Sequence, residues 1–290
     1  MSVVTPRSVL VLAALAMALE MITVPLRAGP LRYSASITGQ FADVGGNDLA
    51  VNLGITTSSG YSFNGYASRS DTRAAAATLE PLYWSATIGK RFGPWSASLG
   101  YRQFDDGLQV ATEDFLAQFG WLSNRGSVAF TLVEGSVVET YQIITANRNV
   151  PITVATDRTG LGVSGDFDLS ERLTINAGVR RYRYADPRSP VAGLPRLQAL
   201  LRSNVFTAQQ GLVDLIWNGG ASWRFSRLSL SADFARSRWR EDGAESDDLF
   251  VALDMPLTQR WTVSLGGGRF TAPDFDPINY GAVTVRFSGP

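Results

Sequence analysis

The side chains that could do chemistry in this chain are arginines and carboxylates, because the sequence contains no histidine and no cysteine. It therefore has no imidazole or thiolate to bind zinc, to activate a nucleophile or to form a disulfide. A Gly-x-Ser-x-Gly motif is also missing, and no spacing singles out a pair of carboxylates for glycoside chemistry. We expect no enzymatic activity, no metal site and no cofactor. What remains is a recurring set of guanidinium and carboxylate groups that could face solutes or pair with one another: Arg32, Arg91, Arg102, Arg180, Arg224, Arg286, Asp114, Asp166, Asp214, Asp233 and Asp254.

The composition excludes further classes of protein. The 290 residues include 26 Lys+Arg and 26 Asp+Glu, so the formal net charge is zero. Proteins that bind nucleic acid normally carry a basic excess, which argues against nucleic acid as a partner. Charged residues make up 18% of the chain, below the roughly 25% of typical soluble domains. The 28 glycines argue against a helical protein.

The elements that must position these side chains show in a strict alternation of residue types. From Leu31 to Phe41 every second residue is Leu, Tyr, Ala, Ile, Gly or Phe, and the residues between them are Arg, Ser, Ser, Thr and Gln. This is the period of a strand with two different faces. The pattern recurs as far as Phe287 and predicts an all-β protein of about 14 strands, within a range of roughly 12 to 16.

The predicted connections alternate in length. Six are short turns, such as Ser58–Gly60 and Gly93–Pro94. Short turns at one end and long loops at the other are typical of antiparallel up-and-down barrels in the outer membrane, with both termini at the short-turn end. The seven long connections are predicted at 42–48, 71–81, 105–113, 135–157, 185–211, 239–247 and 271–279.

Alternation alone does not distinguish a soluble β-protein, with its apolar face inward, from a membrane barrel, with its apolar face towards lipid. Two features favour the membrane. The polar face consists mainly of small residues rather than the Lys and Glu of a solvated surface. Aromatic residues fall at strand ends, where membrane barrels carry their aromatic girdles: Phe41, Phe92, Trp95, Trp121, Phe167, Phe225, Trp261 and Phe287. An exported soluble β-protein stays as an alternative.

The first 28 residues predict an export signal. Arg7 precedes an apolar run, and Ala16-Met17-Ala18 supplies a cleavage motif, with Leu26-Arg27-Ala28 as a second choice. The run is shorter than the ~20 residues that a membrane-spanning helix needs, although an uncleaved anchor stays open. We expect residues 1–28 to be a cleaved signal peptide and residues 29–290 to form a single barrel domain.

The last predicted strand, Tyr280–Phe287, resembles the terminal targeting strand of Gram-negative outer-membrane proteins, which usually ends on an aromatic residue; here Ser288-Gly289-Pro290 follow. In size and strand count the pattern over 31–287 resembles the monomeric fourteen-stranded porins. The resemblance implies a transmembrane β-barrel in the outer membrane, inserted by the barrel-assembly machinery and surrounded by lipid and lipopolysaccharide. It leaves the oligomeric state open.

With the apolar face towards lipid, the eleven arginines and aspartates named above are predicted to line the lumen. Side chains just fill an eight-stranded barrel, whereas 16 to 18 strands enclose an aqueous channel. About 14 strands with many small inward residues therefore favour a porin-like channel for small hydrophilic solutes. The alternative is that the charges pair as struts in a non-conducting structural or adhesin barrel, or that the barrel is the exit pore of a polysaccharide export system.

Two of the long loops are predicted to have structure of their own. In 185–211, Leu194, Leu197 and Leu200 fall at helical spacing and predict a short helix, which either constricts the barrel mouth or caps the loop on the surface. Loop 135–157 is predicted to continue its two strands as a hairpin that turns at Asn147-Arg148-Asn149.

Overall fold

The computed structural model of the chain describes residues 31–43, 46–74, 77–107, 110–145, 148–185, 213–240, 243–273 and 276–289. The predicted signal peptide and the predicted helix within 185–211 lie outside these residues. Among these residues there is no helical segment with the length and hydropathy that a membrane span requires. Its regular elements are fifteen strands: β1 (Arg32–Ala42), β2 (Asn47–Thr56), β3 (Tyr61–Ala74), β4 (Ala77–Leu79), β5 (Leu82–Phe92), β6 (Trp95–Asp105), β7 (Val110–Leu122), β8 (Gly126–Thr145), β9 (Arg148–Asp168), β10 (Leu173–Tyr184), β11 (Val213–Arg224), β12 (Ser229–Trp239), β13 (Glu245–Pro256), β14 (Trp261–Thr271) and β15 (Ile278–Gly289).

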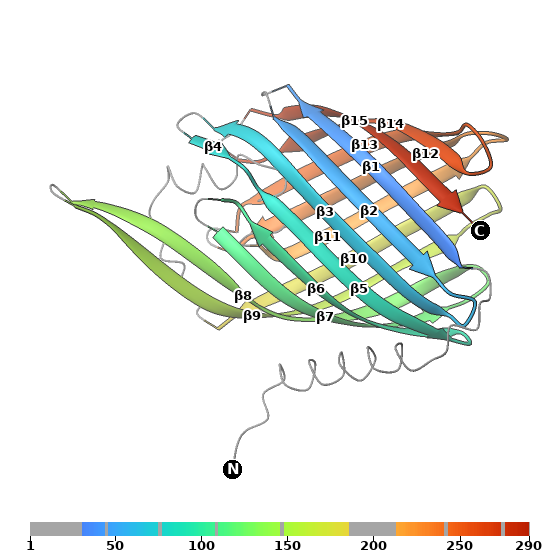
Figure 1. Ribbon diagram of the computed structural model, residues 1–290, viewed down its shortest axis with the longest axis horizontal. Coiled ribbons are helices and arrows are strands. Elements are labelled where there is room, and N and C mark those ends of the chain that lie inside the picture. Colours follow the sequence, from blue (N-terminus) through green and yellow to red (C-terminus); the bar gives the residue numbers. More distant parts are fainter. Residues whose placement is uncertain are drawn as a thin grey trace, which may run out of the picture.

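Fourteen of these strands close into one barrel (Figure 1). Each pairs antiparallel with its neighbours in the sequence, β3 pairs with β5, and β1 pairs with β15 to complete the ring. The three-residue β4 pairs antiparallel with the last three residues of β3 and is not part of the ring. Closure lets the backbone groups of the wall pair between neighbouring strands and leaves no sheet edge, which is what a lipid environment requires. The predicted all-β, antiparallel up-and-down architecture of about 14 strands is confirmed.

The two ends of the barrel differ in their connections. At the short-turn end the strands are joined by tight turns, in which Gly60 and Gly93 have positive φ values of 87° and 63°. These conformations are accessible to glycine at little cost. The first and last strands meet at the same end, where Tyr33 lies opposite Gly289. Both ends of the barrel chain are thus at the short-turn end, as the sequence predicts.

The strands reach further into the predicted long loops than the sequence indicates. β8 and β9 have 20 and 21 residues and pair without interruption as far as Thr145 and Arg148. The hairpin predicted for 135–157 is confirmed, and it projects beyond the rest of the barrel in Figure 1. Its predicted turn is placed too late, because Arg148 and Asn149 already belong to β9 and pair with Thr145 and Ile144. Continuous pairing of the two strands extends as far as Thr145 and Arg148.

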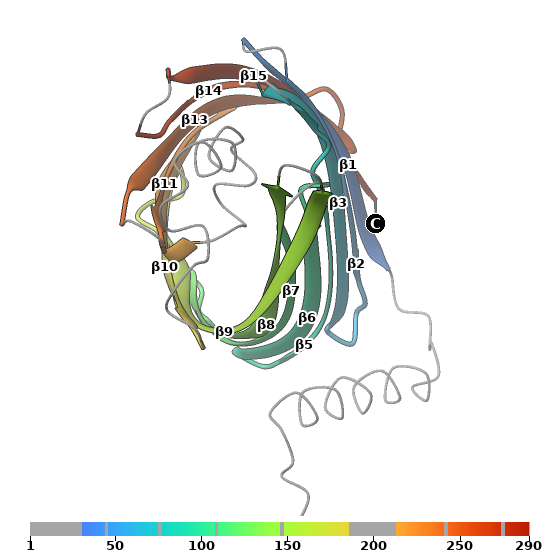
Figure 2. The same ribbon diagram turned by 90° about the vertical axis from the view of Figure 1, so that its left-hand side faces the viewer.

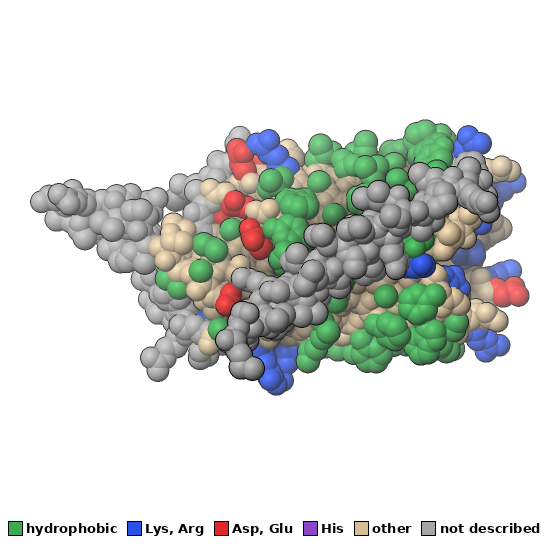
Figure 3. All heavy atoms as spheres, turned by 60° about the horizontal axis from the view of Figure 1, so that its bottom comes forward, with side chains coloured by type: hydrophobic (Ala, Val, Ile, Leu, Met, Phe, Trp, Pro, Cys, Tyr) green, Lys and Arg blue, Asp and Glu red, His purple; other side chains and the backbone are tan. Residues whose placement is uncertain are grey.

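The outer face carries an apolar belt (Figure 3). Side chains such as Ile37 and Leu161 have exposed fractions of 56% and 67%, values that an aqueous β-protein would avoid for a whole ring of strands. Figure 3 shows a band of hydrophobic side chains around the middle of the barrel and Lys and Arg side chains at the short-turn end. Apolar residues therefore face out and polar residues face in, the reverse of a soluble barrel.

Aromatic residues border the belt on both sides. Near the short-turn end Trp95 stacks on Phe119 at 5.2 Å between ring centroids, and Trp261 lies 4.8 Å from Phe287. Towards the long-loop end a second row includes Trp84, Tyr101 and Phe115 on neighbouring strands and the pair Trp217 and Phe234 on two others. Two aromatic rows at the limits of an apolar band are the girdles of an outer-membrane barrel.

Candidate functional site: the barrel lumen

The strand alternation places a polar lining on the inner wall. On β1 and β15 the inward hydroxyl groups of Thr38 and Thr284 lie 2.8 Å apart and share a hydrogen bond. In the half of the lumen nearer the short turns, inward residues such as Asn52, Asn64 and Ser164 are solvent-exposed. Side chains that filled the lumen would bury these residues. This half of the lumen is therefore accessible to water.

Four of the predicted lumen residues lie at the short-turn mouth. Arg32 begins β1 and Arg224 ends β11, while Arg91 and Arg286 each precede the aromatic residue at the end of an apolar row. All four are exposed. Arg91 donates a hydrogen bond from Nε to the carbonyl of Gly93 at 3.2 Å. Together with the other Lys and Arg side chains of the short turns, these four arginines give the mouth a basic rim.

Three of the predicted aspartates are held by polar neighbours rather than by arginines. In each case a hydroxyl or amide group of another strand donates to one carboxylate oxygen. These contacts orient the carboxylates along the wall without neutralising them. The pairs are Ser127 with Asp166, Ser264 with Asp254, and Asn176 with Asp233 at 3.4 Å.

Asp214 is the one predicted residue that leaves the alternation. The register of β11 and β12 shifts between Val213 and Leu215, so Asp214 lies at a bulge. It accepts two hydrogen bonds from Arg238, at 2.9 and 2.6 Å. Arg238 occupies a position of β12 in phase with the outward Leu230 and Phe234. A bulge inserts one extra residue and reverses the face of the side chains that follow, which the sequence did not reveal.

Arg102 and Asp114 are brought together with two residues outside the predicted set, Arg158 and Tyr182. Arg102 donates from Nε to Asp114 at 2.6 Å and from Nη2 to the hydroxyl of Tyr182 at 2.5 Å. Arg158 donates two hydrogen bonds to the same carboxylate, at 2.8 and 2.7 Å. Asp114 and Arg158 are 0% and 2% exposed. We call these four residues the Asp114 cluster; it contains two positive charges and one negative charge.

Glycines allow the Asp114 cluster to form. Gly135 on β8 lies between Asp114 on β7 and Arg158 on β9, and a Cβ atom there would lie 2.2 Å from the Asp114 carboxylate. Any side chain at Gly135 would block the contact across the strand. Gly160 leaves room for the ring of Tyr182 in the same way, since a Cβ atom there would lie 2.9 Å from it.

The sequence contained a signal for Arg158 and Tyr182, which lie in strands just outside the predicted loops 135–157 and 185–211. Arg158 lies in the same phase of β9 as the inward Ser164, and Tyr182 lies in the same phase of β10 as Arg180. Extending the alternation of each strand by a few residues would have added both to the lumen set. Their meeting with Asp114 follows from strand register and not from alternation.

At the long-loop end the β8–β9 hairpin leans over the lumen (Figure 2). A carboxylate oxygen of Glu139 on β8 lies 4.0 Å from a guanidinium nitrogen of Arg240, which follows β12. These two strands are separated by three others around the ring. The guanidinium of Arg240 also lies 4.3 Å from the ring centre of Tyr184. The ion pair therefore ties the hairpin across the mouth towards the end of β12.

Apolar side chains also pack together in the long-loop half of the lumen. They form one buried cluster that draws on β6, β7 and β8 on one side of the ring and on β12, β14 and β15 on the other. Because these side chains from two sides of the ring pack together, the long-loop half of the lumen is narrower than the short-turn half. The cluster consists of Phe104, Val110, Val137, Trp239, Phe270 and Ile278.

On the wall formed by β13–β15, two large inward side chains lie flat against the sheet and do not extend far into the lumen. The rings of Phe250 and Tyr280 stack at 5.8 Å with an interplanar angle of 5°. They lie over Gly266 and Gly268 of β14, where added Cβ atoms would come within 2.4 and 2.3 Å of them. The aromatic rings thus lie against glycine backbone rather than standing across the lumen.

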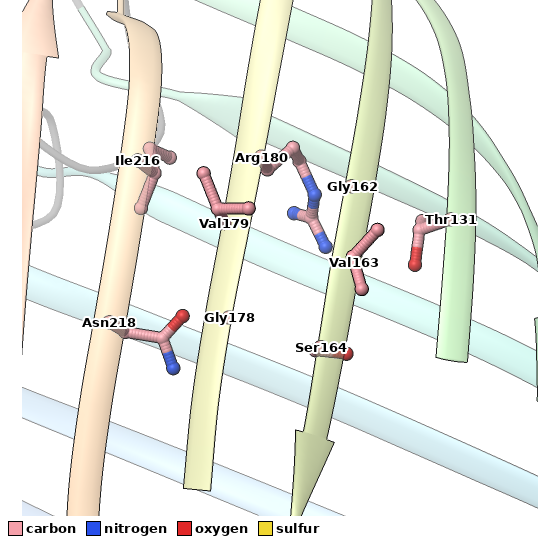
Figure 4. A pocket seen from close by; sticks show the side chains of 9 residues that line it. All are labelled: Thr131, Gly162, Val163, Ser164, Gly178, Val179, Arg180, Ile216 and Asn218. Carbon is pink, nitrogen blue, oxygen red and sulfur yellow. The ribbon is translucent and has the colours of Figure 1, made fainter. Parts of the chain in front are cut away.

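Arg180, the remaining predicted residue, lies in the middle of β10 beside a recess of about 100 Å³. The recess is bordered by Thr131, Gly162, Ser164 and Asn218 among others (Figure 4). Taken together, the lumen has a wide, water-accessible half with a basic rim, a narrow half with packed side chains, and one arginine between them. Within the described residues, no group of three or more carboxylates gathers as metal ligands would. Such a lining can sort solutes by size and charge.

No protein-family model and no curated protein matches the sequence. Solved structures match the fold. OmpT of Vibrio cholerae, expressed in the outer membrane, has 7% sequence identity and a TM-score of 0.54, over 91% of this chain and 99% of that one. The CymD monoaromatic hydrocarbon channel has 10% identity and a TM-score of 0.52, over 95% and 91% of the two chains. The KdgM porin in complex with disordered oligogalacturonate has 8% identity and a TM-score of 0.45, over 89% and 99%.

At these identities the likeness concerns the fold alone. The chain resembles outer-membrane porins and channels in the course of a closed, fourteen-stranded antiparallel barrel.

Proposed function

We propose that the protein is an outer-membrane channel through which small hydrophilic solutes diffuse. The observation that carries the proposal is the contrast between the two faces of one closed sheet. The outer face is apolar and bordered by aromatic rows, whereas the inner face is polar and water-accessible over the short-turn half. A barrel of this size with small inward residues leaves room for water. The proposal is a passive passage and not an enzymatic reaction.

The same proposal includes the route and the surroundings of the protein. Residues 1–28 would direct export and be removed, and the barrel-assembly machinery would insert the remaining chain. Lipid and lipopolysaccharide would then contact the apolar belt. The basic short turns would face the periplasm, and the β8–β9 hairpin would face the outside.

Reconstitution into planar lipid bilayers tests the proposal. The folded barrel, recognised by its heat-modifiable migration in gels, is expected to give discrete conductance steps in KCl. Liposomes that contain the protein are expected to swell in small sugars. A folded barrel that inserts into the bilayer and never conducts would contradict the proposal.

One observation favours a second candidate, a structural barrel without solute flux. The Asp114 cluster and the apolar cluster pack the long-loop half of the lumen from both sides. If this packing closes the passage, the bilayer experiment gives insertion without conductance. Removal of side-chain volume by Trp239→Ala would then be expected to open a conducting state.

A further inference from the structure

We propose that Arg180 forms a binding subsite for the oxyanion group of a small solute, such as a carboxylate or phosphate, in the middle of the lumen wall. The proposal deepens the proposed channel function, since the solute would reach Arg180 through the lumen. Binding at Arg180 is nevertheless a property of the folded barrel and can be measured without any flux.

The first argument is that Arg180 has a buried donor without an acceptor. Its Nε atom is buried and donates no hydrogen bond to any of the residues that the structure describes. The residue lies on the inner face of β10, in phase with Asn176 and opposite to the outward Val179. A buried N–H without a partner costs about 1–3 kcal/mol, and more when the group is charged. An oxygen acceptor that arrives from the lumen would remove this cost.

The second argument is that other buried or half-buried arginines of the barrel have carboxylate partners. Arg102 and Arg158 share Asp114. Arg236 bonds Asp247 at 2.5 Å, and Arg238 bonds Asp214 at 2.6 Å. The wall around Arg180 offers no such partner among the described residues. The inward acids on adjacent parts of the wall are already held by other side chains: Asp166 by Ser127 and Asp233 by Asn176.

The third argument is the shape of the wall beside the guanidinium. Figure 4 shows the Arg180 side chain directed from β10 towards β9, where Gly162 leaves space. A Cβ atom on Gly162 would lie 3.4 Å from Nε of Arg180, and one on Gly178 would lie 2.7 Å from Oδ1 of Asn218. The two glycines therefore keep the recess of about 100 Å³ open beside the charge. That volume accommodates a carboxylate or a phosphate head group, the rest of the solute staying in the lumen.

The chemistry of the recess suits an oxyanion. A guanidinium presents planar N–H donors that match the two oxygens of a carboxylate or phosphate. The hydroxyl groups of Thr131 and Ser164 and the amide of Asn218 add neutral donors around it. The Asp114 cluster on neighbouring strands has one excess positive charge, which adds to the attraction for anions. A cation would meet no carboxylate among the residues that line the recess.

Three variants test the subsite. Arg180→Gln removes the charge, Arg180→Lys keeps the charge but loses the planar fork, and Arg181→Gln removes an exposed charge one residue along β10 on the outer face. Reversal potentials in a KCl gradient are expected to show a Cl⁻/K⁺ permeability ratio at least about fivefold lower in Arg180→Gln, because a unit charge about 4 Å away changes the local concentration of an ion about fivefold in a water-like dielectric. Arg180→Lys is expected to keep most of the ratio, and Arg181→Gln all of it.

A measurement of phosphate binding, which requires no ion flux, accompanies the measurements of reversal potential. Inorganic phosphate is titrated into the folded protein in detergent by calorimetry, and its dissociation constant is expected to rise at least about fivefold in Arg180→Gln. Arg180→Lys should bind with intermediate affinity, and Arg181→Gln should match the wild type. If Arg180→Gln equals the wild type in phosphate binding, the subsite proposal is overturned. If no conductance is found but Arg180-dependent phosphate binding is, the channel function fails and the subsite stands.

Discussion

At the scale of single residues, one carboxylate organises the narrow half of the lumen. Asp114 is fully buried and accepts hydrogen bonds from Arg102 and Arg158, which come from strands on either side of it. Charge-assisted hydrogen bonds of this length are among the strong ones in proteins. The loss of the shared acceptor would leave two buried guanidinium groups without a counter-charge, which is the costly case for buried ion pairs.

We therefore expect Asp114→Asn to lower the free energy of unfolding by about 3–5 kcal/mol, because the amide keeps the volume but not the charge. Urea unfolding of the barrel in lipid vesicles, followed by tryptophan fluorescence, measures the change. Asp233→Asn is the matched control: Asp233 is exposed and holds one hydrogen bond of 3.4 Å, so a change within about 0.5 kcal/mol is expected. Equal stability of the Asp114 and Asp233 variants would show that the cluster does not brace the barrel.

At the scale of strands, the alternation of faces determines what each position tolerates. On β1, Ile37 is exposed on the outer belt, whereas its neighbour Ser36 faces the lumen. The two residues share a strand, a backbone environment and nearly the same depth. The two positions therefore differ in that one side chain faces lipid and the other faces water. The same substitution at both positions can distinguish these two environments.

Ile37→Arg is expected to destabilise the inserted barrel by about 2–4 kcal/mol, the cost of an arginine on the lipid face near the bilayer midplane. Ser36→Arg places the same side chain in the aqueous lumen and is expected to cost less than about 1 kcal/mol. Both variants are compared by unfolding in vesicles and by the yield of heat-modifiable barrel after refolding. Similar losses for the two variants would argue against lipid contact at Ile37.

At the scale of the whole molecule, charge is distributed along the barrel axis. The short-turn mouth has the exposed arginines Arg32, Arg91, Arg224 and Arg286, and Figure 3 shows Lys and Arg side chains gathered at that end. Although the net charge of the chain is zero, its charges are unevenly distributed along the barrel axis. A basic mouth leads to the part of the lumen wall that carries Arg180. Exposed rim charges act through solvent, so salt screens them.

The Cl⁻/K⁺ permeability ratio is accordingly expected to fall towards one as KCl is raised from 0.1 M to 1 M, since the Debye length shrinks from about 10 Å to about 3 Å. Reversal potentials at a fixed concentration ratio measure this. The double variant Arg91→Gln, Arg286→Gln, which removes two rim charges, is expected to have a lower ratio at 0.1 M and a weaker dependence on salt. A wild-type ratio that does not change with salt would contradict a role for the basic rim.

Much of the barrel could be predicted from the sequence, because the face on which a side chain of a strand lies is a local property. Each residue's neighbours two positions away share its side, so the apolar belt, the polar wall and the strand number follow from alternation without knowledge of any contact. Arg102, Asp114 and Arg180 could be assigned to the inner face on this ground. The long β8–β9 hairpin could be expected for the same reason, although its exact turn could not.

What only the tertiary structure decided is which inward side chains meet. Asp114 and Arg158 are 44 residues apart in the chain, and Arg102 and Tyr182 are 80 apart. Their contacts depend on strand register, on the curvature of the ring and on a glycine at position 135 that lets one side chain reach across a strand. The bulge at Asp214 has the same origin, as has the lack of a partner for Nε of Arg180 within the described part of the chain. Alternation determines on which side of the sheet a charge lies, whereas closure of the sheet determines whether that charge is neutralised or left to meet a solute.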